Sequence, residues 1–457
     1  MATLRIRRPP EWGVDPVPEG LRTLRGFDLF VLWSSLGVGL LVLAAGTLLI
    51  SLGLTVAESV AVALAGSLIG GLMLAGAAHH GSRAGVPTMV SLRPILGRAG
   101  SYAPTGLNVL QLLGWAAFEL LVMGTAAAVV TNNILGPWTS VIFVPVFGAI
   151  VAALALGGPL VVVRQWLEKF AIWLVYGSTA AIVAALALRG LDVNARLMAG
   201  AFAGPASYLL ALDLVIVMPI SWWPLVSDYN RFARSGKASA LGTTAGYAVA
   251  NTAFYVLGAA LLAFGLAQSP PISDFLMAIG LLGLGFLPLL FILVDETDNA
   301  FANVYSTAVS LQNLAPKRKQ FWPIVAATGI AMAGAVFLLA RGETIGGGYE
   351  GFLLLVGGLF VPLLGVVIAD SFVVRRRAYR PEEFSTGAPA IRWGAFASWI
   401  PGIALYFAIV YGLLPGFPPV GATLPSFGLA AGLHIALATL AEARASKGSD
   451  APRARNG

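Results

Sequence analysis

The chain has 457 residues, of which 58% are hydrophobic and only 11% charged, and its mean hydropathy is +0.84. Water-soluble domains carry much more charge, so this composition excludes a soluble protein and indicates a polytopic membrane protein. The formal net charge is +7 and cysteine is absent, which excludes disulfides and thiolate chemistry.

The N-terminal segment is basic and proline-rich and lacks the short apolar core of a signal peptide, so residues 1–26 are expected to form a cytoplasmic tail. Apolar segments of about 20 residues follow, each long enough as a helix to cross ~30 Å of hydrocarbon. The sequence therefore predicts an all-α fold with twelve transmembrane helices, at residues 27–52, 55–78, 102–131, 138–156, 160–188, 206–233, 238–266, 287–312, 321–340, 350–373, 393–414 and 423–443.

The basic residues are distributed asymmetrically along this pattern. Twelve spans place both termini on one side, and all but Arg189, Arg196 and Arg341 of the 28 basic residues fall on that side. Such a bias marks the cytoplasmic face and is not the footprint of a nucleic-acid-binding protein. We expect a multi-pass protein of the cell membrane with both termini in the cytoplasm. The short segment 269–285 is expected to form a helix on the outer surface.

Two predicted spans are interrupted in their middle. The first contains Gly37 and Gly39, and the sixth contains Pro219 and Pro224, which remove helical hydrogen bonds. Isolated glycines in membrane helices often serve only close packing. However, these are the first helices of two possible five-helix repeats of opposite orientation, and inverted-repeat transporters place their binding sites at such breaks. The predicted units are residues 27–190 and 206–373, followed by peripheral helices at 393–443 and a disordered cytoplasmic tail at 444–457.

The third span carries a polar stripe. Gln111, Trp115 and Glu119 are spaced by four residues and share one helix face, and Asn108 precedes Gln111 by three. An indole ring beside hydrogen-bonding side chains suits a flat, polar heterocycle. The alternative is a hydrogen-bonded cluster that only joins helices.

The eighth span holds three carboxyl groups, Asp295, Glu296 and Asp298, between long apolar flanks. Three ionised carboxylates so close in a membrane repel one another, so at least one must be protonated or paired with a cation. A carboxylate could ligate Na⁺, or it could load and release a proton in each cycle. In the third interpretation these acids are neutral and cross-link helices.

Other polar residues fit simpler roles. Asp228 and Asp370 lie at predicted cytoplasmic helix ends near arginines, which favours ion pairing. Asp213, in the outer half of the sixth span, either lines an entry path or hydrogen-bonds to a neighbour. His79 and His80 make no metal site by themselves.

An enzyme and a passive channel are the rival classes. The chain has three histidines and no cysteine, and it lacks a phosphate-binding or dinucleotide-binding motif, so the sequence does not favour an enzyme and no cofactor is expected. A passive channel does not require broken helices in paired positions.

Several motifs, in order, resemble the nucleobase–cation symporter family that includes bacterial cytosine permeases. They are "PVPEGLRTLRGFDLFVLW", "LQLLGW", "SDYNRFAR", "ISDFLMAIGLL", "TDNAFANVYS" and "IADSFVVRRR", and they extend over most of the chain. The resemblance implies ten helices in two inverted repeats plus two peripheral helices. It also implies import of purines, pyrimidines, hydantoins, allantoin or a thiamine precursor with sodium ions or protons.

The resemblance also implies roles for individual residues. Trp115 corresponds to a stacking tryptophan, Glu119 stands where hydantoin-type members have a substrate-reading glutamine, and Ser221 and Trp222 lie in the sixth-helix break that contacts substrate. Sodium in this family lies between first-helix carbonyls and the eighth helix. The corresponding ion-coupling residues here are Gly37, Gly39, Asp295, Thr297, Asp298 and Asn299.

The chain departs from the family at two of these positions. Relatives have threonine and asparagine where this chain has Asp295 and Glu296, so Thr297 is the remaining nearby hydroxyl for a Na⁺ ion. The expected substrate-binding residues are therefore Gln111, Trp115, Glu119, Ser221, Trp222, Asp295 and Glu296.

The sequence thus predicts a secondary active importer of a cytosine-like nucleobase or related heterocycle, coupled to Na⁺ or H⁺ by alternating access. The alternatives are a carrier of hydroxymethylpyrimidine or another thiamine precursor, and an allantoin- or hydantoin-type carrier. The expected partners are a small heterocycle and the lipid bilayer, without nucleic acid; the oligomeric state is left open.

Overall fold

A computed structural model describes residues 13–159, 162, 172–190, 192–194, 204–265, 287–342, 347–376, 378–385, 387–415 and 421–449. Throughout these ranges the chain is helical, without a strand, and Leu24 and Ala233 form one isolated bridge. The predicted outer helix at 269–285 lies outside the described residues.

The α-helices are α1 (Gly26–Ser35), α2 (Leu40–Ser51), α3 (Val56–Ala84), α4 (Thr88–Ser91), α5 (Arg93–Leu96), α6 (Tyr102–Val130), α7 (Thr139–Gly157), α9 (Ile172–Leu188), α10 (Pro205–Ile220), α11 (Val226–Asn230), α12 (Gly236–Ala263), α14 (Leu287–Leu314), α15 (Phe321–Ala340), α16 (Gly347–Ile368), α17 (Trp393–Val410) and α18 (Thr423–Ser449).

Short helices of other types complete the described elements. Four are 3₁₀-helices and one is a π-helix that continues α16. They are η1 (Glu19–Leu21), η2 (Gly136–Trp138), η4 (Trp223–Leu225), the π-helix η6 (Ala369–Val374) and η7 (Pro381–Phe384).

Nine described helices are long and apolar enough to cross a membrane, and the bent pair of α1 and α2 makes a tenth candidate. The all-α membrane fold is thereby confirmed for the described residues. Two more predicted spans contain helices outside that set: α9 is described only from Ile172, and α14 carries three acids. The predicted tail begins at 444, whereas the helix α18 continues to Ser449.

The ends of α3 illustrate how local sequence sets the helices. At its start the Thr55 hydroxyl accepts a hydrogen bond from the Glu58 backbone N–H (3.1 Å), and the Glu58 carboxylate accepts one from the Thr55 N–H (2.8 Å). This reciprocal cap satisfies two amides that have no partner in the first turn. At its end Gly85 adopts a left-handed conformation (φ +70°), which glycine reaches without strain.

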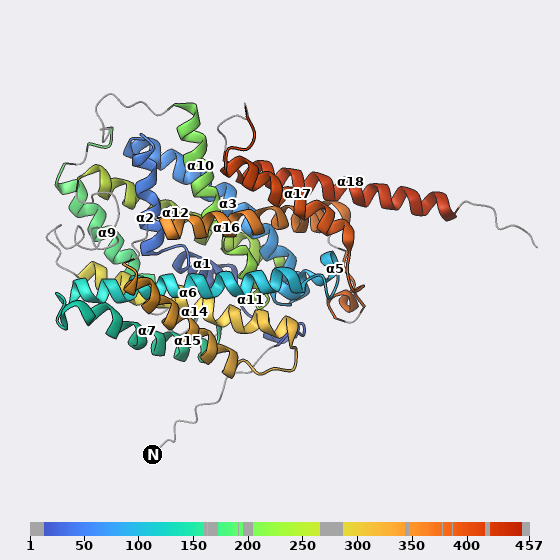
Figure 1. The fold of residues 1–457 in the computed structure, drawn as a ribbon, viewed down its shortest axis with the longest axis horizontal. Coiled ribbons are helices and arrows are strands. Elements are labelled where there is room, and N and C mark those ends of the chain that lie inside the picture. Colours follow the sequence, from blue (N-terminus) through green and yellow to red (C-terminus); the bar gives the residue numbers. More distant parts are fainter. Residues whose placement is uncertain are drawn as a thin grey trace, which may run out of the picture.

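Most of the spans form two groups. The helices α1, α2, α3, α10 and α12 pack against one another, and α6, α7, α14 and α15 form the second group in the lower half of Figure 1. In span order the first group holds spans 1, 2, 6 and 7 and the second holds 3, 4, 8 and 9. Each group therefore combines spans that are five apart, as two five-helix repeats would require. The repeat boundaries themselves stay predictions.

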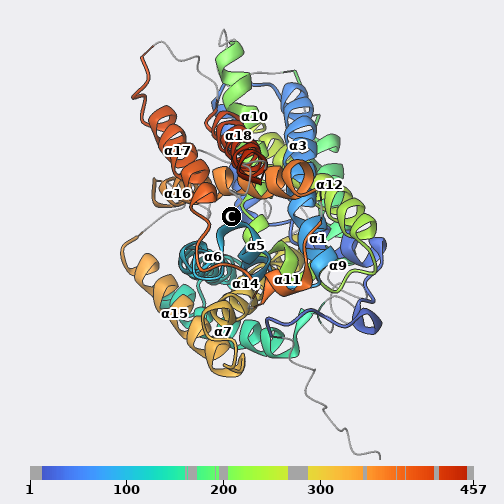
Figure 2. The same ribbon diagram turned by 90° about the vertical axis from the view of Figure 1, so that its right-hand side faces the viewer.

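The helices α16, α17 and α18 pack together (Figure 2), with α17 and α18 at the upper right of Figure 1 and α16 reaching toward its centre. The Asp213 carboxylate of α10 accepts a hydrogen bond from the Thr423 N–H, the first residue of α18, at 3.1 Å. A carboxylate is stabilised by the free amides at a helix N-terminus. Of the two roles considered for Asp213, the structure therefore supports a hydrogen bond to a neighbour.

Glycines bring α2 and α12 into close contact. A side chain on Gly258 of α12 would overlap the Leu43 carbonyl, and one on Gly46 of α2 would overlap the Tyr255 backbone. Small residues let membrane helices approach closely, because packing rather than water drives their association. This contact fixes the second half of the first span, α2, against its neighbour α12.

Candidate functional site

The first span is broken at its middle. The helix α1 ends at Ser35, α2 begins at Leu40, and their axes are bent by 68°. Gly37 packs against α12, where a Cβ atom would lie 3.0 Å from that of Ala250. Gly39 instead faces α14, where a Cβ atom would lie 3.4 Å from the Asn299 amide nitrogen. The interruption predicted from the glycines is therefore present, and its two glycines contact different helices.

The acidic segment of α14 lies directly against this break. The Ser35 hydroxyl donates to Asp295 Oδ1 (2.7 Å), and the Leu40 backbone N–H donates to Glu296 Oε2 (3.2 Å). The Asn299 amide donates to the Val38 carbonyl at 2.9 Å. A broken helix leaves amides and carbonyls without helical partners, and here α14 supplies those partners. The acids are buried in protein at the break.

Several oxygens of this cluster have no hydrogen-bond partner among the described residues. They are both carboxylate oxygens of Asp298, Asp295 Oδ2, Glu296 Oε1 and Asn299 Oδ1. Each of these residues is at most 2% exposed. No lysine or arginine of the described chain pairs with the acids. Buried oxygens of this kind require protons or a cation.

The cluster is not a site for a metal held by many acidic ligands. No group of three or more histidine, aspartate or glutamate side chains in the described chain is arranged to hold a metal ion. The Thr297 hydroxyl donates to the Val294 carbonyl of its own helix at 2.7 Å. Thr297 also lies about 200° around the helix from Asp295, because each residue turns the helix by ~100°.

The third span brings a fourth acid to the cluster. Glu119 of α6 is 3% exposed, and its carboxyl group lies within hydrogen-bonding reach of that of Glu296. Two carboxyl groups form such a bond only when they share a proton. Asp298 also lies close enough to Glu119 to interact with it electrostatically.

The rest of the polar stripe forms a chain of hydrogen bonds. The Trp115 indole donates to Gln111 Oε1 (3.1 Å), and the Gln111 amide donates to Asn108 Oδ1 (2.7 Å). Asn108 then donates to the Pro224 carbonyl (3.1 Å) and to the Ser310 hydroxyl (2.9 Å). The stripe therefore joins α6 to the sixth-span break and to α14.

The sixth span is interrupted where the prolines predict. The helix α10 ends at Ile220, a turn and η4 follow, and α11 resumes at Val226. The Ser221 hydroxyl donates to the Met218 carbonyl (2.7 Å). Trp222 is half-buried with its ring edge-on to Trp33, whose centroid is 6.4 Å away. Trp223 is 1% exposed and donates to the Phe360 carbonyl, so its role is packing.

Sequence reasoning missed two polar contacts of the first span. Ser35 binds Asp295, and the hydroxyl groups of Ser34 and Tyr176 of α9 are hydrogen-bonded to each other. In the sequence, the two serines could have been recognised as site residues because they form a pair just before the glycine break. Nothing in the sequence around Tyr176 points to this contact, because it joins residues 142 apart in the chain.

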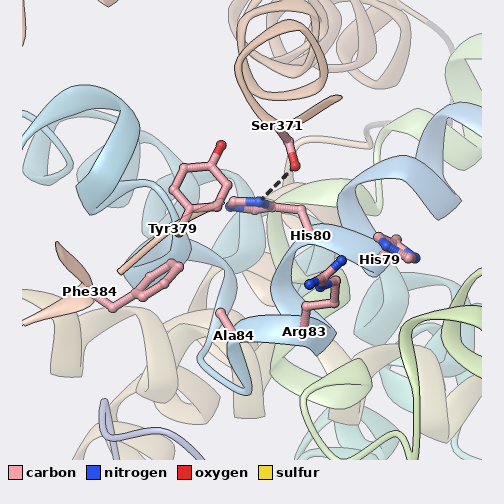
Figure 3. Close-up of a pocket in the computed structure, with 7 residues that line it drawn as sticks. All are labelled: His79, His80, Arg83, Ala84, Ser371, Tyr379 and Phe384. Carbon is pink, nitrogen blue, oxygen red and sulfur yellow. Dashed lines mark hydrogen bonds between the residues drawn. The ribbon is translucent and has the colours of Figure 1, made fainter. Parts of the chain in front are cut away.

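A small pocket of about 110 Å³ lies at another place, beside the end of α3 (Figure 3). His80 bridges Ser371 Oγ (3.2 Å from Nδ1) and the Ser91 carbonyl (3.1 Å from Nε2). His79 lies outside this bridge, and the two histidines do not converge on one point (Figure 3). His80 therefore joins α3 to neighbouring elements, and the two histidines do not form a metal site together.

The two acids expected in ion pairs differ from each other. Asp370 lies 3.6 Å from Arg375 Nε, which confirms its predicted ion pair, and it also contacts His434 (2.9 Å). Asp228 accepts a hydrogen bond from the Thr88 backbone N–H at 2.9 Å, and its predicted partner Arg231 lies close enough to donate to the Asp228 backbone carbonyl (3.2 Å).

Comparison with known proteins gives one family. The family model described as "Permease for cytosine/purines, uracil, thiamine, allantoin" matches residues 16–426. The cytosine permease of Escherichia coli (strain K12) is 26% identical over 79% of this chain and 80% of its own length. The hydantoin permease of Microbacterium maritypicum is 25% identical over 84% of this chain and 82% of its own.

A solved structure has the same fold. Mhp1, a nucleobase-cation-symport-1 family transporter in a closed conformation with bromovinylhydantoin bound, superposes with a TM-score of 0.78. It is 20% identical, and the alignment covers 94% of this chain and 96% of that one.

Proposed function

Because the chain belongs to the family of permeases for cytosine/purines, uracil, thiamine and allantoin, we propose that it imports a flat, amino-substituted heterocycle such as cytosine together with Na⁺ or H⁺. Membership makes the chain a secondary transporter of the membrane rather than an enzyme. The predicted class is thereby confirmed, whereas the substrate, the coupling ion and the site residues belong to the proposal.

One observation carries the proposal: the acids of α14 meet the break between α1 and α2. Asp295 and Glu296 hydrogen-bond to the two sides of the break, and Asp298 has two unpartnered oxygens. A cation that neutralises this charge would hold α1, α2 and α14 together. Its loss would weaken the same contact, which links ion binding to movement between the two helix groups.

The coupling cation has two candidate forms. A Na⁺ ion would take one carboxylate together with the Ser35 hydroxyl and backbone carbonyls of the break, since hard cations prefer oxygen ligands. A proton would bind Asp295 or Asp298 directly. In both cases Gly39 matters because a larger residue would occupy the space next to Asn299 and Glu296. Thr297 supports α14 rather than facing the break.

The carboxyl pair of Glu119 and Glu296 suits a ligand rich in N–H donors. Carboxylate oxygens only accept hydrogen bonds, and an exocyclic amine next to a ring N–H offers two donors in one plane. Cytosine, adenine and aminopyrimidines have such an edge in at least one tautomer. We propose that this edge donates to Glu119 Oε2 and Glu296 Oε1, the unpartnered oxygens of the pair, while the proton that the two acids share stays between them.

The aromatic residues would bind the faces of the ring. Gln111 accepts from the Trp115 indole and so fixes its orientation, and Trp222 is the half-buried tryptophan of the sixth-span break. Rigid aromatic rings stack on planar ligands at low cost in conformational entropy. Ser221 would contribute through its backbone in the break, because its hydroxyl is bound to Met218.

A ligand screen tests the proposed substrate class. The purified protein would be heated with cytosine, adenine, hypoxanthine, hydroxymethylpyrimidine, hydantoin or allantoin, each with Na⁺ or with choline. A ligand at 100 times its Kd stabilises the fold that binds it by about 2.7 kcal/mol. We expect the amino-substituted rings to raise the Tm most. A rise with amino acids and none with heterocycles would contradict the proposal.

A further inference from the structure

A second, larger cavity lies outside the transport site. Its volume is about 590 Å³, and it lies where the spans Gly351–Val374 and Thr423–Glu442 end and the span Trp393–Val410 begins. Its walls include Val374, Leu437 and Ala438. His434 also lines it, eight residues before Glu442, which is about 12 Å along a helix. The cavity therefore extends along α18 from the end of the candidate span Thr423–Glu442 toward its middle.

The two arginines of this cavity differ in how many partners they have. All three nitrogens of the Arg375 guanidinium face oxygens: Nε lies 3.6 Å from Asp370, Nη1 donates to Glu383 (2.7 Å) and Nη2 to the Pro94 carbonyl (3.5 Å). The Arg392 side chain makes one described hydrogen bond, from Nη2 to Glu383 Oε1 at 3.3 Å. Its Nε is buried without an acceptor in the described chain.

Arg392 therefore offers donors that lack acceptors. A guanidinium has five N–H groups in one plane, and they match the oxygens of a phosphate group. The Arg392 side chain is 37% exposed, so a ligand in the cavity can reach it. Burial lowers the pKa of Arg392, and the charge of Arg375 lowers it further, so an anion bound beside Arg392 would stabilise its charged form.

The charges around the cavity argue against a purely anionic ligand. Asp370 and Glu383 balance the charges of Arg375 and Arg392, and Glu442 adds one negative charge among the described residues. His434 faces Asp370, with Nε2 2.9 Å from Oδ1. The described groups have no positive excess, so a phosphate here needs a positive group near Glu442.

We propose that this cavity binds a zwitterionic phospholipid with a primary ammonium head group. The phosphate accepts hydrogen bonds from Arg392, the ammonium donates to Glu442, and an acyl chain lies along Val374 and Leu437. Because the cavity joins the ends of α16, α17 and α18, the bound lipid links the two peripheral helices to the helix that ends the second predicted repeat.

Native mass spectrometry of the purified full chain tests this site. Phosphatidylethanolamine, phosphatidylcholine and phosphatidylglycerol with identical acyl chains would be titrated in separate arms. We expect phosphatidylethanolamine to bind at least tenfold more tightly than the other two, because choline has no N–H donor and glycerol no positive charge. Arg392→Gln should weaken its binding at least tenfold. Arg376→Gln, at an exposed arginine that does not line the cavity, should bind like the unmodified chain.

Three results would overturn the proposal. In the first, the Arg392→Gln and Arg376→Gln variants bind phosphatidylethanolamine equally well. In the second, the unmodified chain binds phosphatidylglycerol as tightly as phosphatidylethanolamine. In the third, it binds glycerophosphoethanolamine, which has no acyl chains, as tightly as phosphatidylethanolamine. If the Arg392→Gln variant does not fold, the Glu442→Gln variant tests the proposal instead. It should lose the preference for phosphatidylethanolamine over phosphatidylglycerol. An unchanged preference in that variant would also contradict the site.

Discussion

Asp295 and Ser35 show what can and cannot be read from single residues. Three acids within four positions of an apolar span are visible in the sequence, and the glycines of the first span are equally visible. The hydrogen bond between Ser35 and Asp295 joins residues 260 apart, so it depends on which helices pack together. Residue types indicated that the buried acids need partners, but only the fold identifies those partners.

Three residues of the polar stripe of α6 follow the structural interpretation that the sequence left open, whereas the stripe's role in binding a heterocycle stays a prediction. Asn108, Gln111 and Trp115 form a hydrogen-bonded chain that reaches other helices, as the structural alternative expects. Glu119 instead faces the acids of α14. Spacing by four residues predicted that these side chains share one face of α6. It could not predict which neighbouring helix each of them contacts.

Glu119→Gln is expected to change substrate preference. The amide brings N–H donors to a position that otherwise only accepts hydrogen bonds, and a lost bond to a charged group costs about 1.5–3 kcal/mol. Binding of cytosine or another amino-substituted ring should weaken at least about tenfold relative to hydantoin. Competition against uptake of a radiolabelled substrate measures this ratio. Glu382→Gln, at an exposed acid, is the control, and equal ratios in both variants would contradict the role of Glu119.

At the scale of helices, the contact between α2 and α12 predicts a stability effect. Gly258→Ala places a methyl group against the Leu43 carbonyl, so the helices must separate. Overpacking of this kind costs about 1–3 kcal/mol. Gly329→Ala adds the same methyl group to α15 where no atom lies within 4 Å. Thermal unfolding should show a lower Tm for Gly258→Ala alone, and equal Tm values would contradict the close packing.

The loop between η6 and α17 predicts a pH effect. Partial burial alone would raise the pKa of Glu383, but hydrogen bonds from the Arg380 backbone and the Arg375 guanidinium outweigh it and lower the pKa. The charged form of Glu383 therefore stabilises the folded state. Its stabilisation is present above the unfolded pKa of about 4.3 and is lost as pH falls through the lower folded value.

Comparing Glu383→Gln with the unmodified chain isolates this group from the other acids. The difference in Tm should be constant above about pH 5 and should shrink as the pH falls below about 4. Thermal unfolding across pH 3 to 8 measures it. A difference that persists undiminished at the acid end would show that Glu383 stabilises the loop by packing rather than by charge.

For the whole molecule, composition and hydropathy predicted the all-α membrane fold and the approximate positions of the long helices that the structure describes. The sequence could not predict that spans 1, 2, 6 and 7 pack apart from spans 3, 4, 8 and 9. Hydropathy reports the depth of a residue in the membrane, whereas packing partners depend on shape over long sequence separations. The glycines of the first span likewise predicted its break but not the 68° angle of the bend.

The topology can be tested with single cysteines, because the chain has none of its own. Val193→Cys lies in a loop predicted to be outside, and Arg318→Cys lies in a loop predicted to be cytoplasmic. Both positions are exposed. A membrane-impermeant maleimide should label Val193→Cys in intact cells and Arg318→Cys only after permeabilisation. The opposite labelling pattern would invert the orientation expected from the basic residues.

The central claim is that a cation must neutralise the acids of α14 as substrate crosses. Proteoliposomes with an imposed Na⁺ gradient, an imposed pH gradient or neither test it most directly, with cytosine as the first substrate. The unmodified chain should concentrate substrate under one of the two gradients, whereas Asp295→Asn should only equilibrate it and the exposed-loop variant Asp192→Asn should behave normally. Accumulation by Asp295→Asn equal to that of the unmodified chain, or accumulation without either gradient, would contradict the account.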